Sequence, residues 1–369
     1  MIIGIPKELK DQESRVAAVP GAVADLVKNG IEVLVETGAG EGSGISDADY
    51  AEAGAKVLDS AAEVWEKSDI IYKVKEPLKE EYQYLREGLI VYCYLHLAGN
   101  EELLDQLLEK KVTAIGFETV VKDGKLPLLR PMSEIAGRMA VQEGARYLTI
   151  PEGGKGILLQ GVPGVRPANV VIVGAGTVGT AATRIAVGMG ARVTVLDVNI
   201  DSLTRLHNIF PDKIETLYSN PLNIDEAVSG ADLVISTVLI PGRRAPQLIK
   251  VDTVKKMSEG SVVVDVAIDQ GGSTDITKDH ATSHSHPIFK EYGVTFYAVG
   301  NIPGAVAKTS TYALSNATTI YAKALGKGGL KDAIEKFPEI GTGVNTHNGQ
   351  VTIESVAQDT GHECKKLEI

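Results

Sequence analysis

Three glycines, Gly174, Gly176 and Gly179, follow the apolar run NVVIV in the segment GAGTVG and precede a helix-forming stretch. In a strand–loop–helix unit, the first glycine permits a tight turn, the second lets a pyrophosphate approach the backbone, and the third lets the helix pack on the strand. The next strand, ARVTVLD, ends in Asp197, 23 residues after Gly174. A carboxylate there binds ribose hydroxyls and repels the extra phosphate of NADP. The pattern predicts an NAD site, and the alternative is a structural turn with Asp197 as a helix cap.

Other strands of the same series also end in residues that could contact a ligand. ADLVISTVL places Val238 and Leu239 at its end, VVVDVAIDQGG places residues 267–269, and FYAVGNIPG places Asn301 and Ile302. Open α/β sheets bind ligands at the carboxyl ends of their strands. We therefore expect these residues on the rim of the nucleotide site, although each one taken singly is more often part of an ordinary loop.

Four ionisable residues could supply acid–base and carboxylate-binding chemistry. Arg15 can grip a carboxylate with its guanidinium fork, and Lys75, at the end of DIIYKVK, can bind a carboxylate or carbonyl oxygen. His96 ends LIVYCYLH, and histidine is the residue type most often used as a general acid or base. Asp269 precedes Gly–Gly where a strand ends, and nearby Asp265 is either its partner or a buried structural acid. The alternatives are solvated cations, a structural histidine and an aspartate in a turn.

Alternating strands and helices must position these residues. The first part of the chain contains strand-like runs MIIGIP, IEVLVET, DIIYKVK, LIVYCYLH and VTAIGFE with helices between them, which predicts a mostly parallel sheet. A long helix, PMSEIAGRMAVQEGARYL, follows, with Ser133 placed to cap its start. Six further strands, from ANVVIVGAG to VTFYAVG, predict a doubly wound sheet, and the chain returns to helix near Lys308. The fold class is therefore α/β, with two Rossmann-like doubly wound domains separated by a cleft.

Composition excludes several classes of protein. A chain of 369 residues suits two domains, and its net charge of -11 argues against nucleic acid as a partner. We expect no export signal in MIIGIPKELK and no membrane span, because the longest apolar runs have only strand length. Two cysteines, Cys93 and Cys364, are too few for a disulfide framework, and Cys93 reads as a buried structural thiol. A cytoplasmic enzyme fits these features.

The motifs together resemble one known family, the L-alanine dehydrogenases, from IGIPKE to KTSTYALSNAT. The motifs that carry the resemblance are ESRVA, KVKEP, YLHLA, PMSEIAGR, LQGVPGV, VIVGAGTVG, VLDVN, VDVAIDQGG and GNIPGAVAKTS. The resemblance implies NAD-dependent interconversion of L-alanine with pyruvate and ammonia. It implies that Arg15 and Lys75 bind the substrate, that His96 donates and accepts the proton, and that Asp269 is the second catalytic group. In the oxidative direction we expect loss of hydride to give an iminium, which Asp269 helps a water to attack.

The resemblance also implies a layout and a set of cofactor contacts. Residues 1–128 and 306–369 would form the substrate domain, with the NAD-binding domain, 129–305, inserted between them, and the chain would form a homohexamer. Besides the loop glycines, the implied cofactor contacts are Ser133, Thr177, Val178, Asp197, Ser219, Val238, Leu239, Ala267, Ile268, Asn301 and Ile302. The sequence departs from the family at Ser202, where many relatives have a basic residue, and in the length of KDHATSHSHPIFK, residues 278–290.

Three other functions are compatible with parts of the pattern. The nucleotide-binding subunit of a proton-translocating transhydrogenase has a similar fold but needs no substrate histidine such as His96. Saccharopine-type dehydrogenases are more distant, and a catalytically silent NAD-binding protein would need only the glycine loop and Asp197. His280, His284 and His286 could suggest a metal, but they lie in a polar loop with no nearby cysteine, so we expect none.

Overall fold

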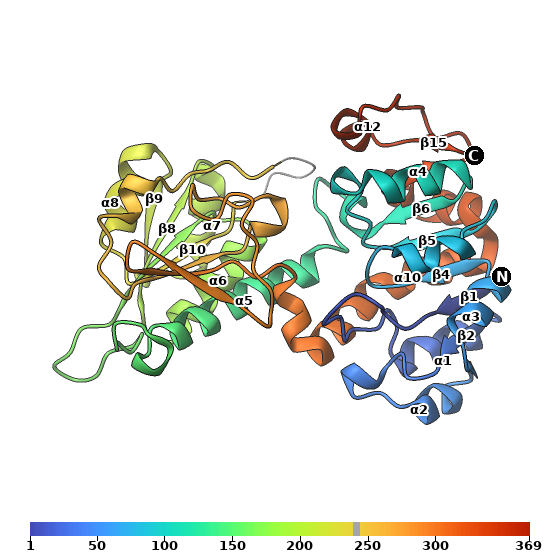
Figure 1. The fold of residues 1–369 in the computed structure, drawn as a ribbon, viewed down its shortest axis with the longest axis horizontal. Coiled ribbons are helices and arrows are strands. Elements are labelled where there is room, and N and C mark those ends of the chain that lie inside the picture. The colour runs from blue at the N-terminus through green and yellow to red at the C-terminus, as the bar shows by residue number, and fades with distance from the viewer. Residues whose placement is uncertain (239–243) are drawn as a thin grey trace. The chain divides into compact units, whose positions relative to one another are not determined.

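The computed structural model describes residues 1–238 and 244–369, which form two compact units (Figure 1). Unit 1 comprises residues 1–132 and 306–369, and unit 2 comprises residues 133–305. Unit 2 is thus inserted in the chain between the two segments of unit 1. The sequence prediction placed these limits at 128/129 and 305/306. One predicted cofactor residue, Leu239, lies outside the described residues.

Within the described residues, unit 1 is built on an eight-stranded sheet in the order β15-β14-β6-β5-β4-β1-β2-β3. Its strands are β1 (Ile2–Ile5), β2 (Glu32–Glu36), β3 (Lys56–Leu58), β4 (Ile70–Tyr72), β5 (Ile90–Cys93), β6 (Thr113–Gly116), β14 (Val344–His347) and β15 (Gln350–Val351). The strands from β3 to β6 are parallel, and β14 pairs antiparallel with β6. The order β3-β2-β1-β4-β5-β6 makes this a doubly wound sheet that reverses direction between β1 and β4.

Helices follow the strands of unit 1, as expected for parallel connections. They are α1 (Pro20–Lys28), α2 (Asp47–Glu52), α3 (Ala61–Lys67), α4 (Glu101–Glu109), α10 (Ala307–Lys336), α11 (Glu339–Gly343) and α12 (Glu354–Thr360), with short 3-10 turns η1 (Glu41–Ser43), η2 (Lys79–Tyr84), η3 (Leu97–Gly99) and η4 (Phe117–Thr119). Strands β4, β5 and β6 are buried along their whole length, which explains their continuous apolar sequences. Cys93 is fully buried in this core, as predicted, and burial raises the pKa of its thiol.

Within the described residues, unit 2 contains a seven-stranded sheet in the order β12-β13-β11-β10-β7-β8-β9. Its strands are β7 (Asn169–Val173), β8 (Arg192–Asp197), β9 (Ile214–Tyr218), β10 (Leu233–Ser236), β11 (Val262–Asp265), β12 (Ile288–Glu291) and β13 (Val294–Tyr297). Its helices and 3-10 turns are α5 (Arg130–Tyr147), which begins in unit 1, η5 (Ile150–Glu152), α6 (Thr177–Gly188), α7 (Ile200–Ile209), α8 (Pro221–Ser229), α9 (Val251–Val254), η6 (Ile268–Gln270) and η7 (Ile302–Val306), which ends in unit 1. All strands are parallel except the edge strand β12, and the direction reverses between β7 and β10.

The prediction of two doubly wound α/β sheets is confirmed, and three local expectations are wrong. Ser133 does not cap a helix, because α5 begins at Arg130 and Ser133 lies in its first turn. The tail is not only helical, since β14 and β15 extend the first sheet. Residues 288–291 form the edge strand β12 rather than part of a polar loop. Each missed strand is short and lies at or near a sheet edge, where an apolar pattern is weakest.

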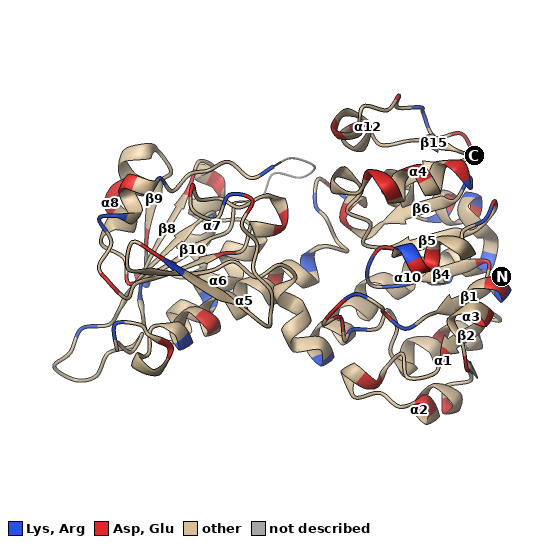
Figure 2. Ribbon diagram, viewed as in Figure 1, with Lys and Arg blue, Asp and Glu red and all other residues tan. Residues whose placement is uncertain are grey.

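Among the described residues, no helix is both long enough and apolar enough to cross a bilayer. In the view of Figure 2, acidic and basic residues are interspersed over both units.

Candidate active site

Arg15, Lys75 and His96 all lie at one edge of the sheet in unit 1. Arg15 is in the segment that leaves β1, and Lys75 and His96 are each three residues beyond the ends of β4 and β5. These three strands are neighbours and parallel, so their carboxyl ends meet where the strand order reverses. Open α/β sheets bind ligands at this position.

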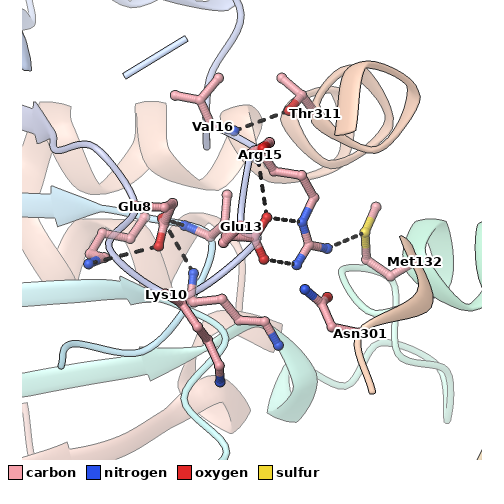
Figure 3. A network of polar contacts seen from close by, with 12 residues as sticks. Glu8, Lys10, Glu13, Arg15, Val16, Met132, Asn301 and Thr311 are labelled. Atoms are coloured by element: carbon pink, nitrogen blue, oxygen red, sulfur yellow. Dashed lines mark hydrogen bonds and ion pairs between the residues drawn. The ribbon is translucent and has the colours of Figure 1, made fainter. Parts of the chain in front are cut away.

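Arg15 is only 2% exposed, so its interpretation as a solvated surface arginine is wrong. Its Nε donates to Glu13 Oε1 at 2.6 Å and its Nη2 donates to Glu13 Oε2 at 2.5 Å, while Nη1 contacts Met132 Sδ at 3.2 Å (Figure 3). Burial alone would lower the pKa of Arg15, but the hydrogen bonds and charge of Glu13 raise it above its ordinary value. The result is a charged guanidinium whose plane is fixed by a bidentate partner.

His96 has an unusual backbone conformation, and its two ring nitrogens have different surroundings. Its φ of 50° lies in the left-handed region, and Glu118 Oε1 accepts hydrogen bonds from the backbone N–H groups of Leu95 at 3.0 Å and His96 at 2.7 Å. The ring Nδ1 lies 3.3 Å from Glu76 Oε2, and the side chain is 44% exposed. Among the residues that the structure describes, Nε2 has no hydrogen-bond partner. One ring nitrogen is therefore held while the other is available.

Glu76 is the buried carboxylate beside His96. Its Oε1 accepts a hydrogen bond from Lys10 Nζ at 2.5 Å, and its side chain is 8% exposed. Burial raises the pKa of Glu76, but the hydrogen bond and charge of His96, together with the charges of Lys10 and Lys75, lower it overall. Sequence reasoning missed both Glu76 and Glu118, although each follows the end of a strand in this sheet.

Lys75 is 7% exposed and its backbone is held by Glu8. Glu8 Oε1 accepts from the backbone N–H groups of Val74 at 2.6 Å and Lys75 at 3.4 Å. Lys73, two residues earlier, is also buried and pairs with Glu81, with Glu8 Oε2 3.9 Å from its Nζ. Glu8 therefore links a buried ion pair to the segment that carries Lys75.

The buried carboxyl group of Glu8 should make the stability of the folded chain depend on pH. Burial raises its pKa from 4.5 to about 7, although Lys73 and the Val74 N–H oppose the shift. Between these values the folded chain holds a proton that the unfolded chain has lost, so stability falls as pH rises through this window. Urea unfolding at about pH 5 and about pH 8 should show this decrease in the free energy of unfolding. In Glu8→Gln the decrease should be smaller by on the order of 3 kcal/mol. An equal decrease in the wild type and in Glu8→Gln would show that Glu8 does not cause the pH dependence.

In unit 2, the predicted glycine loop joins β7 to α6. A Cβ on Gly179 would lie 1.8 Å from the carbonyl oxygen of Gly174, so only glycine fits there. Gly174 has a φ of 109°, and a Cβ on it would lie 2.6 Å from Thr237 Oγ1. A Cβ on Gly176 would meet nothing within 4 Å. The loop thus packs tightly at its first and third glycines and is open at its second, which fits a pyrophosphate at the N-terminus of α6.

Asp197 ends β8 and contacts this loop directly. Its Oδ2 accepts from Ala175 N at 2.5 Å and its Oδ1 accepts from Asn199 N at 2.8 Å. The cap of α7 is Asn199, which accepts from Ser202 N at 3.0 Å, so the interpretation of Asp197 as a helix cap is wrong. Arg205, which sequence reasoning missed, donates to the carbonyl of Ala175 at 2.9 Å. The half-buried carboxylate of Asp197 therefore lies against the loop, as a group for ribose hydroxyls must.

Asp265, the last residue of β11, and Asp269, in η6 beyond it, have different environments. Asp265 is fully buried and accepts hydrogen bonds from Ser273 N and Ser273 Oγ, both at 2.7 Å, so it is the structural acid. Asp269 is exposed in η6, and its Oδ2 accepts from Asn301 N at 3.3 Å. Asn301 itself has a left-handed φ of 61°. Asp269 is thus the acid of this run that can reach a ligand.

The remaining predicted cofactor residues of unit 2 differ in exposure. Thr177 is exposed, and Val178, Ser219, Val238 and Ser133 are intermediate. The buried members are Ala267, Ile268 and Ile302. Thr177, Val178, Ser219, Val238, Ala267 and Ile268 lie beyond the carboxyl ends of strands in this sheet.

Two of the three histidines in residues 278–290 have side-chain contacts to different partners. His280 stacks on Phe289 with ring centroids 4.1 Å apart, and His284 Nε2 lies 3.2 Å from the carbonyl oxygen of Asn301. Within the described part of the chain, no three metal-ligating side chains gather into a possible site.

Two doubly wound α/β sheets in one chain, one with a glycine-rich loop between β7 and α6, place the protein in the two-unit Rossmann class. Comparison with known proteins narrows the class. Residues 4–136 match the N-terminal domain of the alanine dehydrogenase/PNT family, and residues 140–354 match its C-terminal domain. The chain belongs to this family.

The chain is more similar to alanine dehydrogenases than to a transhydrogenase with the same fold. The chain is 53% identical to an alanine dehydrogenase of Bacillus subtilis, over 98% of this chain and 96% of that protein. It is 55% identical to one of Methanococcus maripaludis, over 97% and 96%. A solved L-alanine dehydrogenase matches with a TM-score of 0.93 and 47% identity, covering 98% and 99% of the two chains. A transhydrogenase from Sinorhizobium meliloti matches with 0.82 and 26%, covering 96% and 100%. The predicted membership in the alanine dehydrogenase family is confirmed.

Proposed function

We propose that this chain catalyses the NAD-dependent oxidative deamination of L-alanine to pyruvate and ammonia, and the reverse reductive amination. The observation that carries the proposal is the environment of His96, whose backbone and Nδ1 are held by carboxylates while Nε2 is available. NAD, when bound, accepts the hydride that leaves the alanine Cα. Similarity to alanine dehydrogenases over nearly the full chain supports this choice of substrate.

His96 acts as the general acid and base. In the oxidative direction, loss of hydride from the amino acid leaves an iminium, and water must add to this carbon before ammonia can leave. Nε2 of His96 removes a proton from the attacking water and returns it to the nitrogen. As ammonia departs, Nε2 takes the remaining hydroxyl proton, so that the carbonyl of pyruvate forms. Asp269, exposed in η6 beyond β11, orients the water as the second catalytic group.

Arg15 and Lys75 bind the oxygens of the substrate. The guanidinium of Arg15 is held in one plane by its two hydrogen bonds to Glu13, so that its planar fork is positioned for a carboxylate. The ammonium of Lys75 binds the carboxylate or the developing carbonyl oxygen as a point charge. Two cations suit a substrate that carries a carboxylate in both directions of the reaction.

Arg15→Lys should weaken substrate binding more than turnover. Lysine keeps the charge but loses the planar fork, so the KM for L-alanine should rise by about 10- to 100-fold. Steady-state kinetics measure this effect. Arg86→Lys is a matched control, since the hydrogen-bond partners of Arg86 among the described residues are backbone carbonyls, such as that of Trp65 at 2.9 Å. An unchanged KM in Arg15→Lys would exclude Arg15 from the substrate site.

NAD should be preferred to NADP because of Asp197, whose carboxylate lies against the loop. The test of the function is the initial rate of NADH formation with L-alanine, measured beside L-serine, glycine and NADP. We expect the highest kcat/KM for L-alanine with NAD. Tight NADH binding without turnover of any amino acid would favour a silent NAD-binding protein. A cytoplasmic location and a homohexamer remain predictions, and sedimentation of the full chain would test the second.

A further inference from the structure

Two carboxylates from different elements hold His96 at different atoms. Glu118, in η4 after β6, accepts from the backbone N–H groups of Leu95 and His96. Glu76, after β4, faces Nδ1 of the ring at 3.3 Å. His96 itself follows β5, which lies between those two strands in the sheet. His96 is thus contacted by one carboxylate from each of the two strands that flank β5.

We propose that Glu76 and Glu118 are positioning residues for His96: Glu76 keeps the ring proton on Nδ1, so that Nε2 is the base, and Glu118 holds the left-handed turn that presents the ring. This inference rests on the proposed role of His96 in the reaction. It adds two residues that neither touch the reacting atoms nor stand in the dinucleotide loop.

Glu76 is suited to choosing the tautomer. An ionised carboxylate can only accept a hydrogen bond, so the neutral imidazole must direct its N–H towards it. The other oxygen of Glu76 is fixed by Lys10 Nζ at 2.5 Å, which prevents the carboxylate from rotating away. The other ionisable groups around the pair are Lys75, Glu118 and Tyr94, whose ring centroid lies 6.1 Å from that of His96.

Glu118 acts on the backbone rather than on the ring. A residue other than glycine rarely adopts a positive φ unless its surroundings impose it. One carboxylate oxygen that accepts from two successive N–H groups imposes that turn on Leu95 and His96. Strand β5 ends three residues before His96, so the sheet does not hold the backbone at His96. The direction of the imidazole therefore depends on this turn.

The Glu76 experiment uses Glu76→Gln in the full chain. Glutamine can accept from Nδ1–H or donate to a bare Nδ1, so both tautomers should appear. We expect kcat to fall about 10- to 100-fold with the KM for L-alanine changed less than about 3-fold. Nitrogen NMR of histidine-labelled protein, with His96 assigned by its loss in His96→Gln, reads the tautomer without any turnover. Asp105→Asn is the matched control, because Asp105 lies 3.7 Å from His362 on the surface of unit 1.

The Glu118 experiment separates positioning from mere stability. Glu118→Gln keeps an oxygen that accepts both backbone bonds and should retain most of the activity. Glu118→Ala loses them and should lower kcat about 10-fold, with NADH binding unchanged. If Glu118→Ala fails to fold, loss of activity in Glu118→Gln at an unchanged melting temperature contradicts the role.

The outcomes distinguish this inference from the proposed function. An active wild type, an inactive His96→Gln, and a Glu76→Gln with wild-type kcat and a single tautomer would overturn the inference and leave the function intact. A wild type without alanine turnover would overturn the function, while the tautomer of His96 would still show whether Glu76 directs the ring.

Discussion

His96→Gln is expected to lower alanine-dependent NADH formation by about 10³-fold or more. The residue is the proposed acid and base for both addition of water and departure of ammonia, and general acid–base catalysis contributes about 10²- to 10⁴-fold for a single proton transfer. The side chain is 44% exposed, so its replacement should leave the fold intact. Initial rates in both directions measure the loss.

His362→Gln provides the matched control. His362 is another histidine of unit 1 that faces an acid, but it lies beside α12 and pairs with Asp105. Its replacement should change neither kcat nor KM. Binding of NADH, measured by fluorescence titration, should be the same in both variants and the wild type. More than about a tenth of the wild-type kcat in His96→Gln would rule out the role of His96 as the essential acid and base.

Gly176→Ala is expected to weaken NADH binding by about 100-fold without lowering the melting temperature. An added methyl group at Gly176 meets no protein atom within 4 Å, so the folded chain tolerates it. The methyl group would occupy the space through which the pyrophosphate approaches the loop. Calorimetric titration with NADH, beside a thermal melt, separates the two effects.

Two glycines of the same helix bracket this result. Gly188→Ala also adds a methyl group in open space, but at the far end of α6, so it should leave NADH binding unchanged and stabilise the helix by about 0.5–1 kcal/mol. Gly179→Ala would place its Cβ 1.8 Å from a carbonyl oxygen and should destabilise unit 2. Equal NADH affinity in Gly176→Ala and Gly188→Ala would show that the loop does not hold the phosphates.

Local sequence patterns were sufficient to predict the glycine-rich loop between β7 and α6. The spacing of Gly174, Gly176 and Gly179 is a requirement of backbone geometry, and each glycine shows the predicted tight or open environment. Asp197 could be placed because it ends the very next strand. The parallel strands were predictable for a similar reason, since burial on both faces leaves continuous apolar runs.

The contacts of Glu76 and Glu118 with His96 could not be predicted from local patterns. Glu76 and Glu118 are far from His96 in sequence, and they meet it only because β4 and β6 flank β5 in the sheet. No local pattern encodes which strand ends are neighbours. Arg15 and its partner Glu13 are only two residues apart in sequence. The burial of Arg15, however, depends on how the whole segment packs, which the local sequence does not reveal.

Transfer of deuterium from L-alanine labelled at Cα tests the central claim most directly. The account predicts that the NADH formed carries the label on its nicotinamide ring and that pyruvate and ammonia appear in equal amounts with it. Unlabelled NADH, or no NADH with alanine at any pH at which the chain is folded, would contradict the proposed deamination.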